Sequence, residues 1–159
     1  MSSAAAESVL QKWFRRVWDQ GDVAAIEELA APDVLSHGLL GDIRGRDAWR
    51  QRFYEPMRAM FSDVKVEVLD EVTTGDKTFA KLKARVTARA MPSKPLVLEG
   101  SCMLRCQDGR IVEGWDSWKF HSLLEALRFL PLGALERALL KQLQGQPTSQ
   151  EEPGPEPLP

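Results

Sequence analysis

The chain has 159 residues and a formal net charge of -2, with 43% hydrophobic and 28% charged residues. This length suits a single domain with its own hydrophobic core, and the charge balance argues against nucleic acid or an anionic membrane as a partner. No run of residues is long and apolar enough for a transmembrane helix, and the first residues lack the pattern of a signal peptide, so we expect a cytoplasmic protein.

The two cysteines, Cys102 and Cys106, lie four residues apart in a predicted strand. Their Cα atoms would be roughly 13 Å apart at about 3.3 Å per residue, which is too far for a disulfide bond. The cysteines also lack Cys-x-x-Cys spacing, and only His37 and His121 could add imidazole ligands. We therefore expect no metal site.

Helical patterns dominate the first 61 residues, in which apolar side chains recur three or four positions apart. Gly21 ends the first helix, Asp22 caps the second, and Pro32 stops it. Pro56 should kink the third helix or restart it. The expected elements are helices over 4–20, 22–32 and 46–61, with a short strand over 33–38 and a loop that ends near Gly45.

Several side chains of these elements suit either the core or a ligand pocket. Phe14 and Trp18 belong to the apolar stripe of the first helix, while Tyr54 and Met57 belong to the third helix. Core packing is the ordinary role of such residues, and methionine in particular fills gaps in cores. The alternative is that all four contact a ligand. His37, near the end of the short strand, is either a structural residue or a proton carrier.

Residues 62–120 alternate between apolar and polar side chains, which predicts β-strands. Short turns separate the strands, so we expect an antiparallel meander. The predicted strands cover 64–74, 79–90, 96–107 and 110–120. In the second of these the apolar face consists largely of alanine, which leaves room either for an overlying helix or for an internal cavity.

The last predicted strand contains the most informative residue. Asp108-Gly109 is a strong two-residue hairpin signal, so the strand begins at Arg110. Counting by twos from there puts Asp116 and Trp118 on one apolar face and Ile111 on the other. A carboxylate on an apolar face is paired, neutralised by a raised pKa, or directed into a cavity.

The C-terminal part predicts two helices and a tail. Ser122 can cap a helix that stops at Pro131, and an amphipathic helix follows over 132–144. Residues 145–159 are rich in Pro, Gly, Gln and Glu, which is typical of a disordered tail. The expected organisation is one domain over 1–131, then the amphipathic helix, then the tail.

The order of these elements, with certain short motifs, resembles the SnoaL-like polyketide cyclase branch of the nuclear transport factor 2-like superfamily. The resemblance implies an α+β fold in which a curved, mostly antiparallel sheet wraps on N-terminal helices as a cone-shaped barrel with an internal pocket. The motifs are Ala31-Pro32-Asp33-Val34, His37-Gly38, Arg44-Gly45-Arg46-Asp47-Ala48, and Asp108-Gly109-Arg110-Ile111-Val112-Glu113 with Trp115.

The resemblance to this family implies that the pocket contains an acidic residue, which carries protons in an intramolecular aldol ring closure without a metal or organic cofactor. Asp116 is the matching candidate. The related limonene epoxide hydrolases use an Asp-Arg-Asp arrangement, but residues 100–103 here are Gly, Ser, Cys and Met, so that mechanism does not carry over. Aligning on the tryptophan instead of the turn would direct Ser117 into the pocket.

Two functions remain open. The first is a small cofactor-free enzyme in which Asp116, sheltered by Trp118 and assisted by His37, performs acid/base chemistry on an apolar ligand that contains a carbonyl group. The second is a non-catalytic small-molecule-binding or dimerisation module, in which a neighbouring N–H satisfies Asp116. The helix over 132–144 could bind a second copy to give a homodimer, another partner, or a membrane surface.

Overall fold

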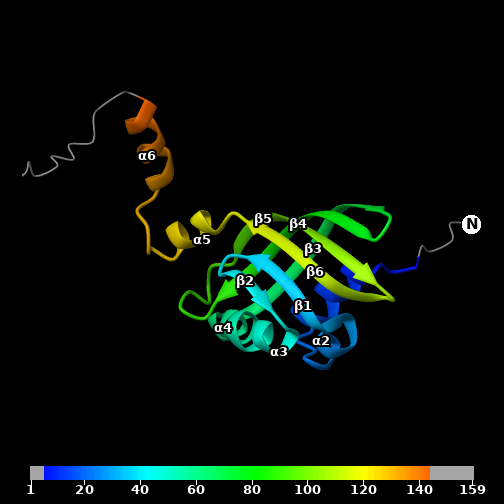
Figure 1. The fold of residues 1–159 in the computed structure, drawn as a ribbon. Helices are drawn as coiled ribbons and strands as arrows, with labels where there is room; N and C mark the ends of the chain where they lie inside the picture. Colours follow the sequence, from blue (N-terminus) through cyan, green and yellow to red (C-terminus); the bar gives the residue numbers. More distant parts are fainter. Residues whose placement is uncertain (1–5, 144–159) are drawn as a thin grey trace, which may run out of the picture.

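The computed structural model describes residues 6–143 and has the expected α+β fold, with one six-stranded sheet curled around helices (Figure 1). The strand order is β2-β1-β6-β5-β4-β3, so β2 and β3 are free edges and the sheet does not close into a barrel. The strands are β1 (Ala30–Gly38), β2 (Gly41–Arg44), β3 (Phe61–Thr74), β4 (Lys77–Ala88), β5 (Leu96–Gln107) and β6 (Arg110–Trp118).

The predicted meander is confirmed, because β3, β4, β5 and β6 pair in sequence as antiparallel neighbours. β5 has the predicted bounds, and β4 begins and ends two residues earlier than expected. β1 pairs in parallel with β6, which brings the first and last strands of the domain together. The alternating apolar side chains of the meander cover the concave face of the sheet.

The first strand is longer than predicted. The second helix, α2 (Ala24–Leu29), ends before Pro32, and β1 begins at Ala30. Pro32 lies inside the strand because the β1–β6 register is interrupted between Ala30 and Leu35, and proline is tolerated where the ladder of hydrogen bonds is broken. The expected loop before Gly45 also contains the short strand β2.

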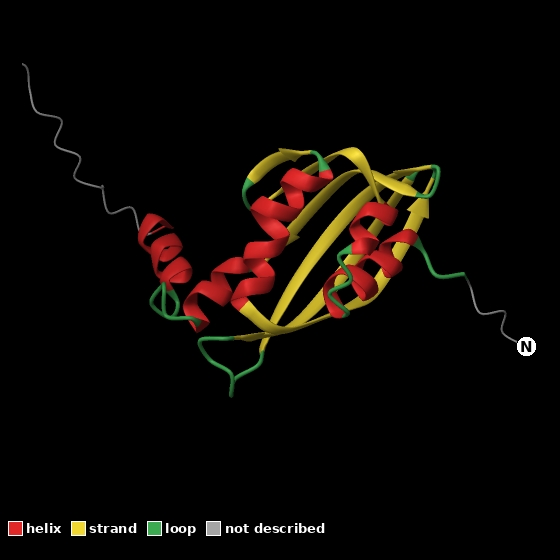
Figure 2. Ribbon diagram, turned by 90° about the horizontal axis from the view of Figure 1, so that it is seen from below, coloured by secondary structure: helices red, strands yellow, loops and turns green. Residues whose placement is uncertain are grey.

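Two helical segments cover the concave face of the sheet (Figure 2). The first starts later than predicted, since Ser8 caps α1 (Val9–Lys12), and it continues as a wider π-helical stretch, η1 (Trp13–Asp19). Residues 4 and 5 of the expected helix lie outside the described part. The second segment consists of α3 (Arg46–Trp49), η2 (Arg50–Tyr54) and α4 (Glu55–Met60), and Pro56 follows the π-helical turns of η2.

One detail of the predicted strand register is wrong. Arg105 pairs with Glu113 while Cys106 pairs with Ile111, so Val112 is an extra residue in β6. This β-bulge turns Ile111 inward, where it is 3% exposed and belongs to the core. Counting by twos from the turn therefore assigned Ile111 to the wrong face. Beyond the bulge, Asp116 is directly opposite the buried Cys102.

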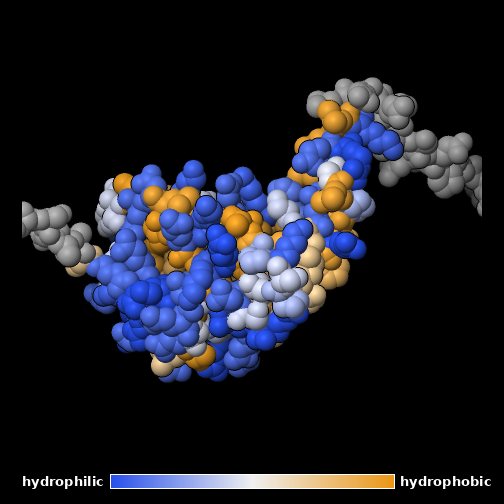
Figure 3. Space-filling view, turned by 180° about the vertical axis from the view of Figure 1, so that it is seen from behind, coloured by the Kyte–Doolittle hydropathy of each residue, from blue (hydrophilic) through white to orange (hydrophobic). Residues whose placement is uncertain are grey.

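The C-terminal helices leave apolar side chains uncovered. α5 (Phe120–Ala126) starts before Ser122 and is shorter than predicted, because Arg128 adopts a positive φ of 63°. α6 (Ala134–Leu143) projects from the domain and carries orange, apolar side chains (Figure 3). Among residues 6–143, no helix has the length and hydropathy needed to cross a membrane. The predicted tail over 145–159 lies outside the described residues.

Candidate active site

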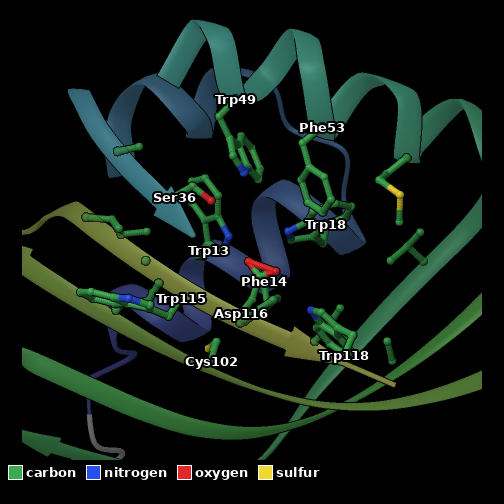
Figure 4. A pocket seen from close by; sticks show the side chains of 18 of the residues that line it. Trp13, Phe14, Trp18, Ser36, Trp49, Phe53, Cys102, Trp115, Asp116 and Trp118 are labelled. Carbon is green, nitrogen blue, oxygen red and sulfur yellow. The ribbon is translucent and has the colours of Figure 1, made fainter. Parts of the chain in front are cut away.

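A cavity of about 110 Å³ lies between the concave face of the sheet and the helices (Figure 4). Its floor comes from β4, β5 and β6, and its roof comes from η1, α3 and η2. Most of its lining is apolar, and the alanine-rich face of β4 contributes Ala84. The aromatic residues that contact it include Trp13, Phe14, Trp18, Trp49, Phe53 and Trp118.

The aromatic side chains of the roof hold one another in place. The ring of Trp18 is edge-on to Trp49 and to Phe53, with 6.2 Å between centroids in each pair. It also lies edge-on to Tyr54 at 5.2 Å. Such tilted and edge-on arrangements are the favourable ones for aromatic pairs. Trp13 packs against the other side of Trp49, at 5.2 Å, so the roof is a continuous aromatic cluster.

Asp116 brings a carboxylate into this apolar space. Figure 4 shows it rising from β6 toward the rings of Trp13, Trp18 and Trp49. Burial raises the pKa of Asp116 from its ordinary value of 3.8 to about 6. In the part of the chain that the structure describes, no charge or hydrogen bond offsets this loss of solvation. Asp116 is therefore a carboxyl group that changes protonation state near neutral pH.

Cys102 lies opposite Asp116, and burial disfavours its thiolate form. Burial first, and then the charges of Asp116 and Glu71, raise the pKa of the Cys102 thiol to about 12. The thiolate is the reactive form, so Cys102 stays a neutral, small side chain on the cavity floor. Both Cys102 and Cys106 are free thiols, as their predicted spacing requires.

His37 is not part of the lining of the aromatic cavity. Its Nδ1 lies 2.7 Å from Asp42 Oδ1, and its Nε2 lies 3.0 Å from Glu113 Oε1. Its ring stacks on Trp115, with 4.9 Å between centroids. Glu113 first, and then Asp42, hold the pKa of His37 above its ordinary value. His37 and Asp116 do both line a second, more open cavity of about 670 Å³.

Ser36, which the sequence reasoning missed, lines the cavity one position before His37. It pairs with Gly114 of β6, two residues before Asp116 and on the same face of the sheet. The alternation of Val34, Ser36 and Gly38 in β1 is the signal that could have identified it. Arg46 also reaches the cavity, where its Nη1 donates to the carbonyl oxygen of Glu27 at 3.0 Å.

Of the predicted ligand contacts, Phe14, Trp18, Met57 and Trp118 line the cavity. Tyr54 does not, because it is buried behind Trp18 and its hydroxyl donates to the carbonyl oxygen of Val17 at 2.8 Å. The exposed Ser117 is also absent from the lining. Six aromatic residues of the lining are missing from the prediction: Trp13, Trp49, Phe53, Phe61, Trp115 and Phe120.

Over residues 6–143, no group of three or more His, Cys, Asp or Glu side chains is arranged to hold a metal ion.

A curled sheet packed on helices around an aromatic cavity defines an α+β protein of the ketosteroid isomerase-like fold. The same fold is described for a Catenulispora acidiphila protein in complex with trimethylamine. That protein has 20% identity and a TM-score of 0.67 over 82% of this chain and 96% of its own. The model of the SnoaL-like polyketide cyclase family matches residues 8–127. The chain belongs to the SnoaL-like polyketide cyclase family.

Two further solved structures are similar over most of their length. IdmH of Streptomyces antibioticus, a proposed polyketide cyclase, has 28% identity and a TM-score of 0.66 over 76% of this chain and 96% of its own. AclR of Streptomyces galilaeus, a proposed hydroxylase, has 21% identity and a TM-score of 0.66 over 77% of this chain and 95% of its own. No curated protein matches the sequence significantly.

Proposed function

We propose that the protein is an acid/base enzyme of cyclase or isomerase type, which acts on an apolar small molecule that contains a carbonyl group. The observation that carries this proposal is the carboxyl group of Asp116, which faces an aromatic cavity with a pKa of about 6. A proton carrier works best when its pKa lies near the working pH. Asp116 meets that condition without a charged partner in the described residues.

At neutral pH most Asp116 side chains are ionised, so the group acts first as a base. It takes a proton from the carbon next to the carbonyl group, and the electron pair of the broken C–H bond forms the enolate. In ring closure, the enolate carbon then bonds to a second carbonyl carbon of the same molecule, whose oxygen takes up the proton. In isomerisation, Asp116 returns the proton to another carbon.

The cavity walls favour a flat, apolar substrate. Trp13, Trp18 and Trp49 form the roof, while Trp118 reaches the cavity from the sheet. Aromatic walls bind planar rings over a large contact area. Membership of the SnoaL-like polyketide cyclase family and the likeness to IdmH support a substrate of polyketide type, which carries several carbonyl groups on a planar skeleton.

The test follows hydrogen–deuterium exchange at the carbon next to the carbonyl group of 2-tetralone, by NMR in D₂O. We expect the wild-type protein to accelerate the exchange above the rate without protein. Asp116→Asn should keep the fold and lose at least a hundredfold of this acceleration, in line with the contribution of roughly 10² to 10⁴ made by general base catalysis.

Asp70→Asn, which changes an exposed carboxylate of β3, is the matched control and should keep full activity. Exchange catalysed equally well by wild type and Asp116→Asn would rule out Asp116 as the base. Tight binding of 2-tetralone without any acceleration would favour the second function, a binding module.

We also propose that the protein forms a homodimer through α6. The helix leaves Leu135, Leu139 and Leu140 about half exposed, at 45%, 56% and 54%, and exposed apolar faces of this kind are typical of protein interfaces. The charges of Glu136 and Lys141 near opposite ends of the helix favour an antiparallel pair. Light scattering should give twice the chain mass for wild type and a single chain mass for Leu135→Gln/Leu139→Gln.

A further inference from the structure

Several polar groups of the cavity have no role in the mechanism so far. Among the polar groups that line it, two come from elements packed close to Asp116: the hydroxyl of Ser36, from β1, and the indole N–H of Trp13, from η1. The lining also includes the indole N–H groups of Trp18, Trp49, Trp115 and Trp118. Figure 4 shows the Trp13 indole nitrogen on the side of its ring that faces the carboxylate of Asp116, and Ser36 beside the ring of Trp13 in this view. The hydrogen bonds found among residues 6–143 involve neither group. Both groups therefore have donors available to a ligand.

An unused indole N–H in an apolar cavity points to a ligand oxygen. The indole nitrogen only donates, and buried indoles usually find a partner. A cationic ligand would instead need the face of the ring, whereas Trp13 directs the nitrogen of its ring toward the cavity (Figure 4). The ligand group that suits Ser36 and Trp13 together is an acceptor, such as a carbonyl oxygen.

The backbone explains why both groups are held next to Asp116. Ser36 pairs with Gly114, and Asp116 follows two residues later on the same face of β6. Because Gly114 has no side chain, the floor of the cavity stays open beside Ser36. Trp13 is fixed from above by the ring of Trp49, at 5.2 Å. Donors and base thus come from rigid elements, which is what a preorganised site requires.

We propose that the Ser36 hydroxyl and the Trp13 indole N–H donate hydrogen bonds to the carbonyl oxygen of the ligand, next to the carbon on which Asp116 acts. This inference rests on the proposed function and adds to it the residues that bind the oxygen. When Asp116 takes the proton, the C–H electron pair becomes the C=C bond of the enolate, and the negative charge moves to the oxygen. Hydrogen bonds to that oxygen strengthen as the charge develops. Return of the proton from Asp116 to carbon restores the ketone.

The test compares two flat probes of nearly equal size, 2-naphthol and naphthalene, by titration calorimetry with the full chain. 2-Naphthol resembles the enol of 2-tetralone and carries the oxygen, whereas naphthalene lacks it. We expect wild type to bind 2-naphthol about tenfold or more tightly than naphthalene, since one hydrogen bond can raise the affinity by about this factor. Ser36→Ala should lower the affinity for 2-naphthol about five- to tenfold and leave the affinity for naphthalene unchanged. Trp13→Phe also reduces the aromatic roof, so it should weaken the binding of both probes and lower the affinity for 2-naphthol about five- to tenfold more than that for naphthalene.

Ser117→Ala is the matched control, because it removes a hydroxyl one residue from Asp116 on the exposed face. It should bind both probes like wild type. The inference is overturned if wild type does not bind 2-naphthol more tightly than naphthalene, or if Ser36→Ala keeps the full preference for 2-naphthol. Circular dichroism and naphthalene binding report whether each variant is folded.

These measurements separate this inference from the proposed function, because they follow binding and not turnover. If Asp116→Asn retains proton exchange, the proposed function fails even where Ser36 binds the oxygen. If Ser36→Ala and Trp13→Phe leave the preference for 2-naphthol over naphthalene unchanged while Asp116→Asn abolishes exchange, only the assignment of the donors fails. A selective loss of 2-naphthol affinity in both variants supports it.

Discussion

Gly38 lies directly against the carboxylate of Asp116. A Cβ atom added to Gly38 would come within 2.9 Å of Asp116 Oδ2 and 3.4 Å of its Cγ and Oδ1. The backbone of Gly38 does not have a positive φ, so backbone conformation does not require glycine here. The absence of a side chain instead leaves the space that the carboxylate occupies.

Gly38→Ala is therefore expected to displace the carboxylate while the fold is kept, because a carboxylate at the end of a side chain can rotate away. A misplacement of about 1 Å can cost roughly a hundredfold in rate, so the exchange of 2-tetralone should fall between tenfold and a hundredfold. Ser117→Ala is the control, since it changes the exposed neighbour of Asp116 in β6 and should keep the wild-type rate. Equal activity of the two variants would contradict this role of Gly38.

Proton exchange should depend on pH through Asp116. Because its pKa is about 6, the basic carboxylate is lost as the pH falls below 6. We expect the protein-catalysed rate to be level above pH 7 and to fall about tenfold per pH unit below pH 5. The measurement is a series of exchange rates between pH 4.5 and 8, corrected for the rate without protein. A rate that rises toward low pH would mean that the acid form is the active one.

Asp116→Asn should make the protein more stable at neutral pH. Below pH 3.8 the carboxyl group is protonated in both the folded and the unfolded state. As the pH rises to about 6, the unfolded chain loses this proton while the folded protein retains it, so the free energy of unfolding decreases. The ionised carboxylate lowers the free energy of unfolding by at most about 3 kcal/mol, because each unit of pKa difference corresponds to about 1.36 kcal/mol.

Urea denaturation at pH 4 and pH 7.5 tests this expectation. The variant should exceed wild type in stability by about 1 to 3 kcal/mol at pH 7.5 and by little at pH 4. Such a gain, combined with lost exchange, is the usual sign of a group kept for function at the expense of stability. A variant that is less stable than wild type at pH 7.5 would show that the carboxylate is satisfied in the folded protein.

His37 should have the opposite pH dependence, because its charged form is stabilised. Glu113 and Asp42 hold the pKa of His37 above 6.5, and Arg105 shares Glu113 at 3.0 Å. The stabilisation is complete below pH 6.5 and is lost as the pH rises through the pKa of the folded state. His37→Gln should thus cost about 1 kcal/mol at pH 5.5 and less at pH 9.

This variant also separates stability from catalysis. Because His37 lies outside the aromatic cavity, its replacement should leave the exchange of 2-tetralone within twofold of wild type at pH 7.5. Asp42→Asn, which removes one partner of His37, should give a smaller loss of stability in the same direction. A large loss of exchange in His37→Gln would indicate that His37 contributes to the site through Trp115.

The meander and the position of Asp116 were predictable because local signals define them. Alternation of side chains and the Asp108-Gly109 turn are enough to assign β5 and β6, and the face that Asp116 shares with Trp118 is what predicts that Asp116 points inward. The bulge at Val112 was not predictable, since an extra residue changes the alternation without changing the composition of the strand. Ile111 was assigned to the wrong face for this reason.

The β1 side of the site could not be predicted from local patterns. Its parallel pairing with β6 joins residues about 80 positions apart, and Pro32 resembles a helix stop more than a strand residue. Without that pairing, the sequence does not indicate that Ser36 lies on the same face as Asp116, and it leaves His37 as either a structural residue or a proton carrier. The aromatic residues of the roof were predicted only in part, because helical periodicity identifies the apolar face of a helix but not which of its side chains line a cavity.

The parallel pairing of β1 with β6 also has a consequence for how the protein is made. During synthesis β1 leaves the ribosome about 80 residues before its partner. Closing so long a stretch of chain is entropically costly and slow compared with forming local hairpins. We therefore expect the carboxylate and its cavity to assemble at the end of folding. A chain released before Trp118 would expose the apolar concave face of the sheet and an unpaired edge of β1. Chaperones and proteases recognise such surfaces, so the incomplete chain would be degraded and would not act as a partial enzyme.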